Sequence, residues 1–258
     1  MNYEVETVEA GEYRLPVHHF GPGTSSMDVL WELIEAGECP VWGTTLMERQ
    51  SAGRGRMGRS WQSPPGHVYG ALRLPTEPPF DGPGASLALS VLLALALNEY
   101  GFPAGLKWPN DLILAEAKVG GLLLESRKDA LIAGIGFNLG SPPEGDWLKE
   151  RAAGAPPPGA IDWDGGPKAL WAGLVKNAFL LYNKKFGSRS ISHLLPEAER
   201  LLLWRGRTVK VDRPASEPLA PESGLTGRIV GLGPEGQLFL TTSAGSYQVW
   251  SGTLLLVE

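Results

Sequence analysis

The chain has 258 residues, of which 43% are hydrophobic and 20% are charged, and its formal net charge at pH 7 is −5. This balance is typical of a folded globular protein, and the negative charge provides no general attraction to DNA or to an anionic membrane. The single cysteine, Cys39, excludes an internal disulfide framework and fits a reducing, cytoplasmic compartment.

The first hundred residues alternate strand and helix signals. A helix is predicted where Ser25 and Ser26 precede an apolar stripe with an i, i+3, i+4 spacing. The helix at Ala85–Tyr100 has about thirteen mostly apolar residues before Asn98, fewer than the roughly 20 needed to span a bilayer, so it is predicted to be a buried core helix. The remaining predictions here are β structure in 3–21, the first helix in 24–38, and strands in 40–47 and 66–75.

The next hundred residues contain strong strand signals followed by a helix. Pro109 and Asn110 break the run 105–126 into two strand-like pieces around a tight turn. The runs 118–126 and 129–140 are rich in Leu, Ile and Val and are predicted to pair. Residues 140–166 are rich in Gly and Pro, which predicts a surface connection, and 167–187 forms an amphipathic helix pattern.

The character of the sequence changes near residue 200. Short strand patterns separated by Gly-rich turns predict a small β-barrel. The boundary divides the chain into a larger domain, 1–200, and a small domain, 201–258. Residues 213–224 have little apolar content and are predicted to be a mobile loop.

The segment Glu48–Pro64 raises the main functional question, because it contains three glycines, four arginines and a tryptophan. Gly53, Gly55 and Gly58 match the dinucleotide pattern G-x-G-x-x-G. That pattern has to open a helix, however, and two prolines and a glycine follow within eight residues. A dinucleotide-binding turn is therefore disfavoured.

Two other interpretations of this loop are an Arg-Gly segment that binds single-stranded nucleic acid and a solvated basic loop without function. The net negative charge disfavours the first, and the glycine spacing, which lets a backbone approach a ligand, disfavours the second. Guanidinium groups at Arg54, Arg56 and Arg59 can surround phosphate or carboxylate oxygens, and Trp61 offers a flat face. The loop is thus predicted to hold an anionic ligand.

Five segments follow one another in the chain: "TSSMD" at 24–28, "GRGRMGRSW" at 53–61, "KWPND" at 107–111, "KVGGLLLE" at 118–125 and "GIGFNL" at 134–139. In this order they resemble the motifs of the biotin protein ligases. The terminal "SGTLLLV" resembles part of that family's small C-terminal barrel. The resemblance implies an α+β fold, with a mixed β-sheet flanked by helices and a small C-terminal SH3-like β-barrel.

The resemblance also implies a two-step ligation that uses ATP, biotin and Mg²⁺. The biotin carboxylate would attack the α-phosphate of ATP to give biotinyl-5′-AMP, and a lysine of a biotin carboxyl carrier domain would then displace AMP. Both reactants of the first step are anionic, so cationic side chains have to offset their repulsion. The sequence contains neither a G-x-S-x-G elbow nor a P-loop, which agrees with a reaction that needs no enzyme nucleophile.

Roles follow from the resemblance residue by residue. Lys118 and Arg56 are the expected catalytic residues, and Asp111 is the candidate ligand of Mg²⁺. The expected biotin-binding residues are Ser25, Ser26, Gln50, Gly53, Arg54, Gly120 and Gly121. The expected ATP-binding residues are Arg56, Arg59, Trp61, Lys107, Asn110, Asp111 and Asn138.

Each role has a structural alternative. Ser25 could be only a helix N-cap, Trp61 only a core residue, Lys118 only a strand-edge lysine, and 107–111 only a turn. The alternatives for the whole protein are a lipoate or octanoyl transferase, and a non-catalytic protein that binds biotin or nucleic acid. Only about twenty residues precede the biotin segment, so the resemblance implies the ligase-only class, with no N-terminal DNA-binding domain, no DNA or membrane partner, and a homodimer as an open expectation.

Overall fold

The structure, a computed structural model, describes residues 3–145, 152–212 and 224–257. An eight-stranded mixed sheet has the strand order β1-β2-β3-β4-β8-β7-β6-β5, in which β2 and β3 pair in parallel and the other neighbours are antiparallel. Its strands are β1 (Tyr3–Ala10), β2 (Tyr13–Phe20), β3 (Thr44–Met47), β4 (Val68–Leu74), β5 (Gly105–Lys107), β6 (Asp111–Leu114), β7 (Ala117–Arg127) and β8 (Ala130–Phe137).

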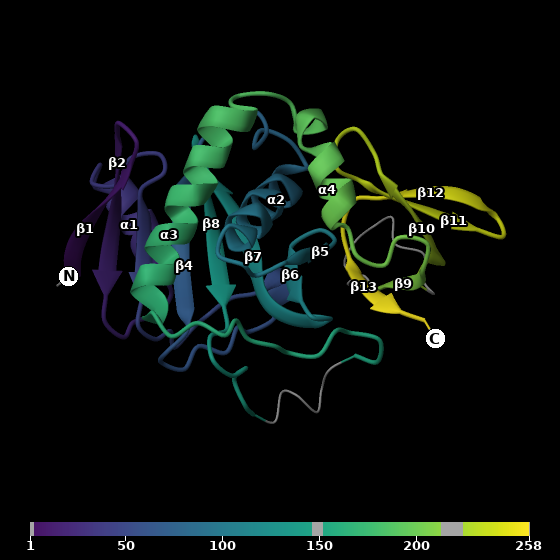
Figure 1. Ribbon diagram of the computed structural model, residues 1–258, viewed down its shortest axis with the longest axis horizontal. Coiled ribbons are helices and arrows are strands. Elements are labelled where there is room, and N and C mark those ends of the chain that lie inside the picture. Colours follow the sequence, from purple (N-terminus) through teal and green to yellow (C-terminus); the bar gives the residue numbers. More distant parts are fainter. Residues whose placement is uncertain (1–2, 146–151, 213–223, 258) are drawn as a thin grey trace.

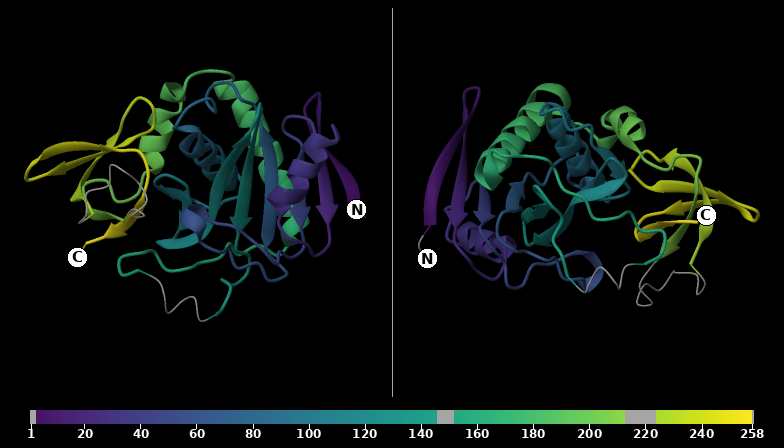
Figure 2. Two further views of the ribbon diagram at one scale, coloured as in Figure 1. Left: turned by 180° about the vertical axis from the view of Figure 1, so that it is seen from behind. Right: turned by 60° about the horizontal axis from the view of Figure 1, so that its bottom comes forward.

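Helices cover both faces of this sheet. Helices α2 (Ala85–Asn98) and α3 (Gly166–Leu181) pack on one face, as Figure 1 shows, while α1 (Ser26–Glu35) lies on the other, visible from behind in Figure 2. Because side chains alternate along a strand, Leu72 and Ala133 join the core under α2 and α3, whereas their neighbours Ala71 and Ile132 pack with α1. The expected mixed sheet flanked by helices is confirmed.

A second, five-stranded antiparallel sheet lies at the end of the molecule opposite β1 and β2 (Figure 1). Its order is β12-β11-β10-β9-β13, with β9 (Thr208–Asp212), β10 (Thr226–Leu232), β11 (Leu238–Thr242), β12 (Gly245–Val249) and β13 (Thr253–Leu256). This small sheet is consistent with an SH3-like unit. Among the described strands, however, β12 and β13 remain unpaired with each other, so the expected barrel is not closed.

Most predicted elements are present, with differences at three places. The run 105–126 forms three strands, because a second turn follows β6 at Ala115 and Glu116, both with positive φ. Helix α3 ends in a π-helical turn (Tyr182–Phe186), and a 3₁₀ turn (Ile191–His193) and helix α4 (Leu195–Leu201) were not predicted. Residues 213–223 of the predicted mobile loop lie outside the described residues.

The predicted surface connection at 140–166 is mostly exposed or half-buried over its described residues, but its second part also pairs with the main sheet, which was not predicted. Residues 157–161 run beside the main sheet: the Lys118 N–H donates to the Pro157 carbonyl (2.7 Å), and the Ile161 N–H donates to the Asn138 carbonyl (2.8 Å). Ile161 is fully buried. An extended Pro- and Gly-rich segment has no internal hydrogen bonds, so its pairing with distant strands leaves no local signal. None of the described helices is long and apolar enough to cross a membrane.

Candidate functional site

A cavity of about 650 Å³ lies on the α1 face of the main sheet, between that helix, the Glu48–Pro64 loop and the second sheet. It brings together residues from all five motif segments. The predicted site residues that line it are Ser25, Ser26, Gln50, Arg54, Arg56, Arg59, Trp61, Lys107, Asn110, Asp111, Lys118, Gly121 and Asn138.

Two predicted residues, Gly53 and Gly120, are not among those that line the cavity. Gly120 faces the α2 side of the sheet, where an added Cβ would strike the ring of Phe137. A Cβ on Gly53 would meet the Ser63 Oγ at 2.7 Å, so this glycine permits close packing within the loop. Packing therefore explains both glycines without a ligand.

The floor of the cavity is built from glycines on one face of adjacent strands. Gly121 on β7 is the register partner of Gly136 on β8, and Leu123 is the partner of Gly134. The Trp61 ring rests on Gly136, where a Cβ would come within 2.6 Å of it, and Met27 rests on Gly134. Larger side chains at Gly134 and Gly136 would displace Met27 and Trp61, so the period-2 placement of these glycines lets both lining side chains rest on β8.

One end of the cavity carries neutral hydrogen-bonding groups. Ser25 is the N-cap of α1, because its Oγ accepts the Met27 N–H at 3.3 Å. The predicted N-cap role is therefore confirmed, and Ser25 also lines the cavity. The Ser26 N–H and Oγ both donate to Gln50 Oε1, at 2.8 and 3.1 Å, and Gln50 Nε2 donates to Ser63 Oγ at 3.0 Å. These bonds fix the Gln50 amide in one orientation beside two buried hydroxyls.

The other end is cationic and centred on Asp111. One carboxylate oxygen of Asp111 lies 2.6 Å from Lys118 Nζ, and the other lies 2.8 Å from Lys107 Nζ. Burial by itself would raise the pKa of Asp111, but the two lysines outweigh it and hold that pKa below its usual value. Burial also lowers the pKa of Lys107, against the attraction of Asp111.

The glycine-arginine loop reaches from this cationic end to the second sheet. Arg56 Nη1 donates to Asn110 Oδ1 at 2.9 Å, and Arg59 Nη2 donates to Thr253 Oγ1 on β13 at 3.3 Å. The loop turns through Met57 and Gly58, both of which have positive φ. Arg56 and Arg59 therefore stand between the main sheet and the second sheet.

Trp61 and Asn138 complete the cationic end. Lys118 Nζ lies 5.4 Å from the centroid of the Trp61 ring, within the range of a cation–π contact. Trp61 Nε1 is buried and finds no hydrogen-bond acceptor among the described residues. Asn138 Nδ2 donates to the Gly159 carbonyl at 2.8 Å, which ties it to the segment that runs beside the sheet.

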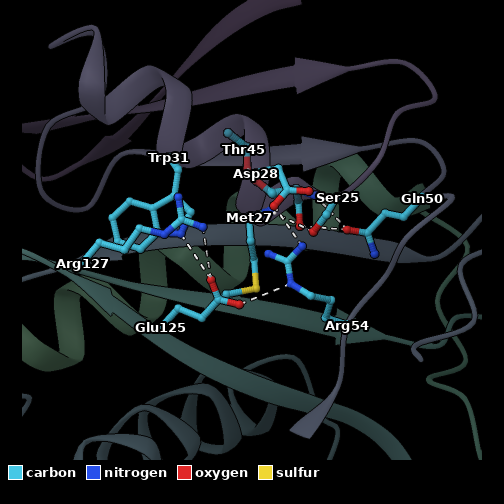
Figure 3. Close-up of polar contacts among 10 residues, drawn as sticks. Ser25, Met27, Asp28, Trp31, Thr45, Gln50, Arg54, Glu125 and Arg127 are labelled. Atoms are coloured by element: carbon cyan, nitrogen blue, oxygen red, sulfur yellow. Dashed lines mark hydrogen bonds and ion pairs between the residues drawn. The ribbon is translucent and has the colours of Figure 1, made fainter. Parts of the chain in front are cut away.

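Arg54 differs from the other two arginines of the loop. Its Nη1 donates to Asp28 Oδ1 at 2.9 Å, and its Nε donates to Glu125 Oε1 at 3.3 Å (Figure 3). Partial burial acts against its charge, but the Asp28 and Glu125 carboxylates raise the pKa of Arg54 above its usual value. The guanidinium thus joins α1 to β7.

Sequence reasoning missed several residues that line the cavity. Gly134 and Gly136 form a visible G-x-G spacing within "GIGFNL", so the alternation of a strand could have identified them. The contributions of the second sheet and of residues 152–158 carry no sequence signal, because only the tertiary fold brings them here. The lining residues that were not predicted include Met27, Gly134, Gly136, Ala155, Pro156, Pro158, Asp212, Gly252, Thr253 and Leu255.

Comparison with known proteins gives a consistent result. Residues 20–140 match the model of the biotin/lipoate A/B protein ligase family. The bifunctional ligase/repressor BirA of Bacillus subtilis is 27% identical over 221 residues, covering 82% of this chain and 65% of the relative. A biotin--[acetyl-CoA-carboxylase] ligase of Paracoccus denitrificans is 38% identical over 133 residues, covering 47% of this chain and 53% of the relative. The matches thus span between half and two thirds of the length of these two curated relatives.

The solved structures extend the likeness to nearly the whole fold. The biotin protein ligase from Aquifex aeolicus, in complex with biotin and ATP, superposes with a TM-score of 0.75 at 29% identity and covers 94% of this chain and 98% of that one. The enzyme from Leishmania major with biotinyl-5-AMP has a TM-score of 0.64 at 21% identity and covers 90% of this chain and 98% of that one, a likeness of fold alone. Residues 20–140 are thus similar to the biotin/lipoate A/B protein ligase family, and nearly the whole chain has the fold of the solved biotin protein ligases.

Proposed function

We propose that the protein is an ATP-dependent biotin protein ligase that activates biotin as biotinyl-5′-AMP and transfers it to a lysine of a biotin carboxyl carrier domain. The observation that carries the proposal is a single cavity with a neutral hydrogen-bonding end and a strongly cationic end. A solved relative holds biotin and ATP together. The alternatives of lipoate transfer and of simple binding have no comparable support.

The neutral end suits the ureido ring of biotin. That ring has two N–H donors and one carbonyl acceptor, so it needs both kinds of partner. Ser25, Ser26 and Gln50 provide hydroxyl and amide groups that can serve either way, and the two serines are buried where an unpaired polar group would be costly. Gly134 lets the Met27 side chain rest on β8, and Gly121 lies beside Lys118 and Asp111, where the cationic end begins.

The cationic end suits the first chemical step. A biotin carboxylate oxygen forms a bond to the α-phosphorus, and the bond from that phosphorus to the pyrophosphate oxygen breaks. Four cationic side chains, Lys118, Lys107, Arg56 and Arg59, outnumber the two lining carboxylates, Asp111 and Asp212. The excess positive charge stabilises negative charge that spreads over phosphate oxygens. Asp111 holds the two ammonium groups in place. Trp61 and Asn138 would contact the adenine and ribose.

In the second step, the neutral ε-amine of the carrier lysine attacks the anhydride carbonyl. A C–N bond forms, the C–O bond to AMP breaks, and the amine loses a proton to solvent. The same cationic groups stabilise the phosphate that leaves as AMP. No enzyme atom becomes covalently attached at any stage.

The expected Mg²⁺ site at Asp111 does not fit the geometry. Both carboxylate oxygens of Asp111 lie within 2.8 Å of lysine ammonium groups, and no group of three or more His, Cys, Asp or Glu residues that could hold a metal occurs in the described ranges. Mg²⁺ commonly binds through substrate phosphates and water. Mg²⁺ remains a proposed companion of ATP, with no protein ligand assigned.

The test is a transfer assay with labelled biotin, ATP, Mg²⁺ and an isolated carrier domain. The expected result is one label per carrier domain, bound as an amide that survives hydroxylamine, and no label on a carrier whose acceptor lysine is replaced by arginine. Parallel reactions with lipoate and octanoate should give no product. Transfer of lipoate or octanoate in place of biotin, or ligand binding without transfer, would refute the proposal.

A further inference from the structure

Arg54 sits in a different electrostatic setting from Arg56 and Arg59. Around Arg54, two cations and two carboxylates balance: Arg54 and Arg127 against Asp28 and Glu125, as Figure 3 shows. At the other end of the cavity, four cations, Lys107, Lys118, Arg56 and Arg59, outnumber the two lining carboxylates, Asp111 and Asp212. An incoming polyphosphate is therefore attracted to the second group and not to Arg54.

The partners of Arg54 are themselves held in place. The second carboxylate oxygen of Glu125 accepts the Trp31 Nε1–H at 3.3 Å and lies 4.0 Å from Arg127 Nη2. The Arg127 guanidinium lies 4.7 Å from the centroid of the Trp31 ring. Glu125 thus presents one fixed oxygen to Arg54, while Asp28 comes from the first turn of α1.

The position of the bridge is at the neutral end of the cavity. Arg54 lies close to Ser25, Gln50 and Met27 (Figure 3), and its two ion pairs connect α1 with β7 across Met27. The backbone on this side is also fixed, since the Ala52 N–H donates to the Thr24 carbonyl at 2.9 Å. Of the three side chains, Arg54 lines the cavity, and its partners Asp28 and Glu125 hold it from outside the lining.

We infer that Asp28 and Glu125 are positioning residues that hold Arg54 as a fixed bridge across the end of the cavity, so that Arg54 closes the biotin end while Arg56 and Arg59 act on the phosphates. The inference rests on the proposed function and assigns the three arginines of one loop to two tasks. It also explains why a neutral ligand end contains an arginine at all. The carboxylates of Asp28 and Glu125 neutralise the positive charge of Arg54, so this charge holds the bridge together.

The first test compares Asp28→Asn, Glu125→Gln and the double variant with the unaltered protein in adenylate formation. The double variant should raise KM for biotin by about tenfold, because it removes both negative charges that hold the Arg54 guanidinium. Both kcat and KM for ATP should stay within about twofold, because the side chains proposed to bind the phosphates are unchanged. Adding Arg54→Gln to the double variant should give little further change, since all three changes break the same bridge. Glu32→Gln, an exposed acid one turn further along α1, is the matched control.

The second test measures, in the absence of any substrate, whether the bridge holds the loop in place. Amide hydrogen exchange of residues 51–55 should accelerate in Asp28→Asn and Glu125→Gln but not in Glu32→Gln. Unchanged exchange in both variants would overturn the bridge even if biotin transfer is demonstrated. A rise in KM for ATP or a fall in kcat, with KM for biotin unchanged, would show that Arg54 serves the phosphates. If the unaltered protein fails to bind biotin, the proposed function fails, and the exchange result still decides whether the bridge exists.

Discussion

At the scale of single residues, the site depends on one carboxylate that serves two lysines. Asp111 was expected to bind ATP or a metal, yet both of its oxygens are occupied by Lys107 and Lys118. Sequence reasoning could place these three residues in one site, because they belong to two adjacent motifs. It could not assign their pairing, because that depends on the register of β6 and β7, in which Asp111 lies opposite Gly121 and leaves room for the Lys118 side chain.

Asp111→Asn tests this ion-pair cluster through the pH dependence of stability. The folded-state pKa of Asp111 is lowered, so its contribution is present above the unfolded value of about 3.9 and is lost as pH falls through the folded-state pKa. The variant should lose about 3–5 kcal/mol at pH 7, because two lysines lose their partner. The melting-temperature gap to the unaltered protein should narrow progressively below about pH 4.

Thermal unfolding at a series of pH values provides the measurement. Asp81→Asn, at an exposed position, is the control and should show no gap at any pH. A gap for Asp111→Asn that keeps the same size from pH 7 to pH 2 would contradict the account of this cluster.

At the scale of elements, glycines decide which face of a strand is open and which is packed. In β4, Tyr69 and Ala71 face the side of the cavity and α1, whereas Gly70 faces α3 and receives the ring of Trp171. The strand itself was predictable from its apolar run. Which glycine touches a ligand and which admits a tryptophan was not, because the partner of Gly70 lies about 100 residues away in the chain.

Gly70→Ala tests the packed face. Its methyl group would overlap the Trp171 ring, which is fully buried and has little room to move. Overpacking of this kind should destabilise the fold by about 1–3 kcal/mol, measured by urea unfolding. Gly82→Ala, where an added Cβ meets nothing within 4 Å, should change stability little. Equal stability of the two variants would show that the α3 interface is looser than described.

At the scale of the whole molecule, the second sheet completes the site. Thr253 on β13 accepts from Arg59, and the ring centroid of Trp204, which precedes β9, lies 5.9 Å from Lys107 Nζ. The change in character near residue 200 predicted a separate C-terminal unit, and the division at 200 and 201 is retained as a proposal. Its contacts with the glycine-arginine loop could not be predicted, because the sequence pattern of each segment does not say which distant segment it contacts.

Trp108→Phe tests how firmly the two sheets are joined. Trp108 is buried, and its Nε1–H donates to the Gly236 carbonyl at 2.9 Å. Phenylalanine keeps most of the apolar surface but leaves that carbonyl without its donor, which should cost about 1–3 kcal/mol. Hydrogen exchange in β10 and β11 should accelerate more than in β1 and β2. Trp250→Phe, at a 44% exposed position, should leave exchange unchanged, and a similar response of both variants would contradict a specific junction.

The central claim, that Lys118 and its neighbours drive the activation of biotin, is tested most directly by single-turnover formation of biotinyl-5′-AMP from biotin and ATP labelled at the α-phosphate. The unaltered protein should form the adenylate without a carrier domain. Lys118→Ala should slow this step by about 100-fold or more while biotin still binds, because a cation facing developing charge is worth several kcal/mol. Adenylate formation by Lys118→Ala at the rate of the unaltered protein would contradict the account.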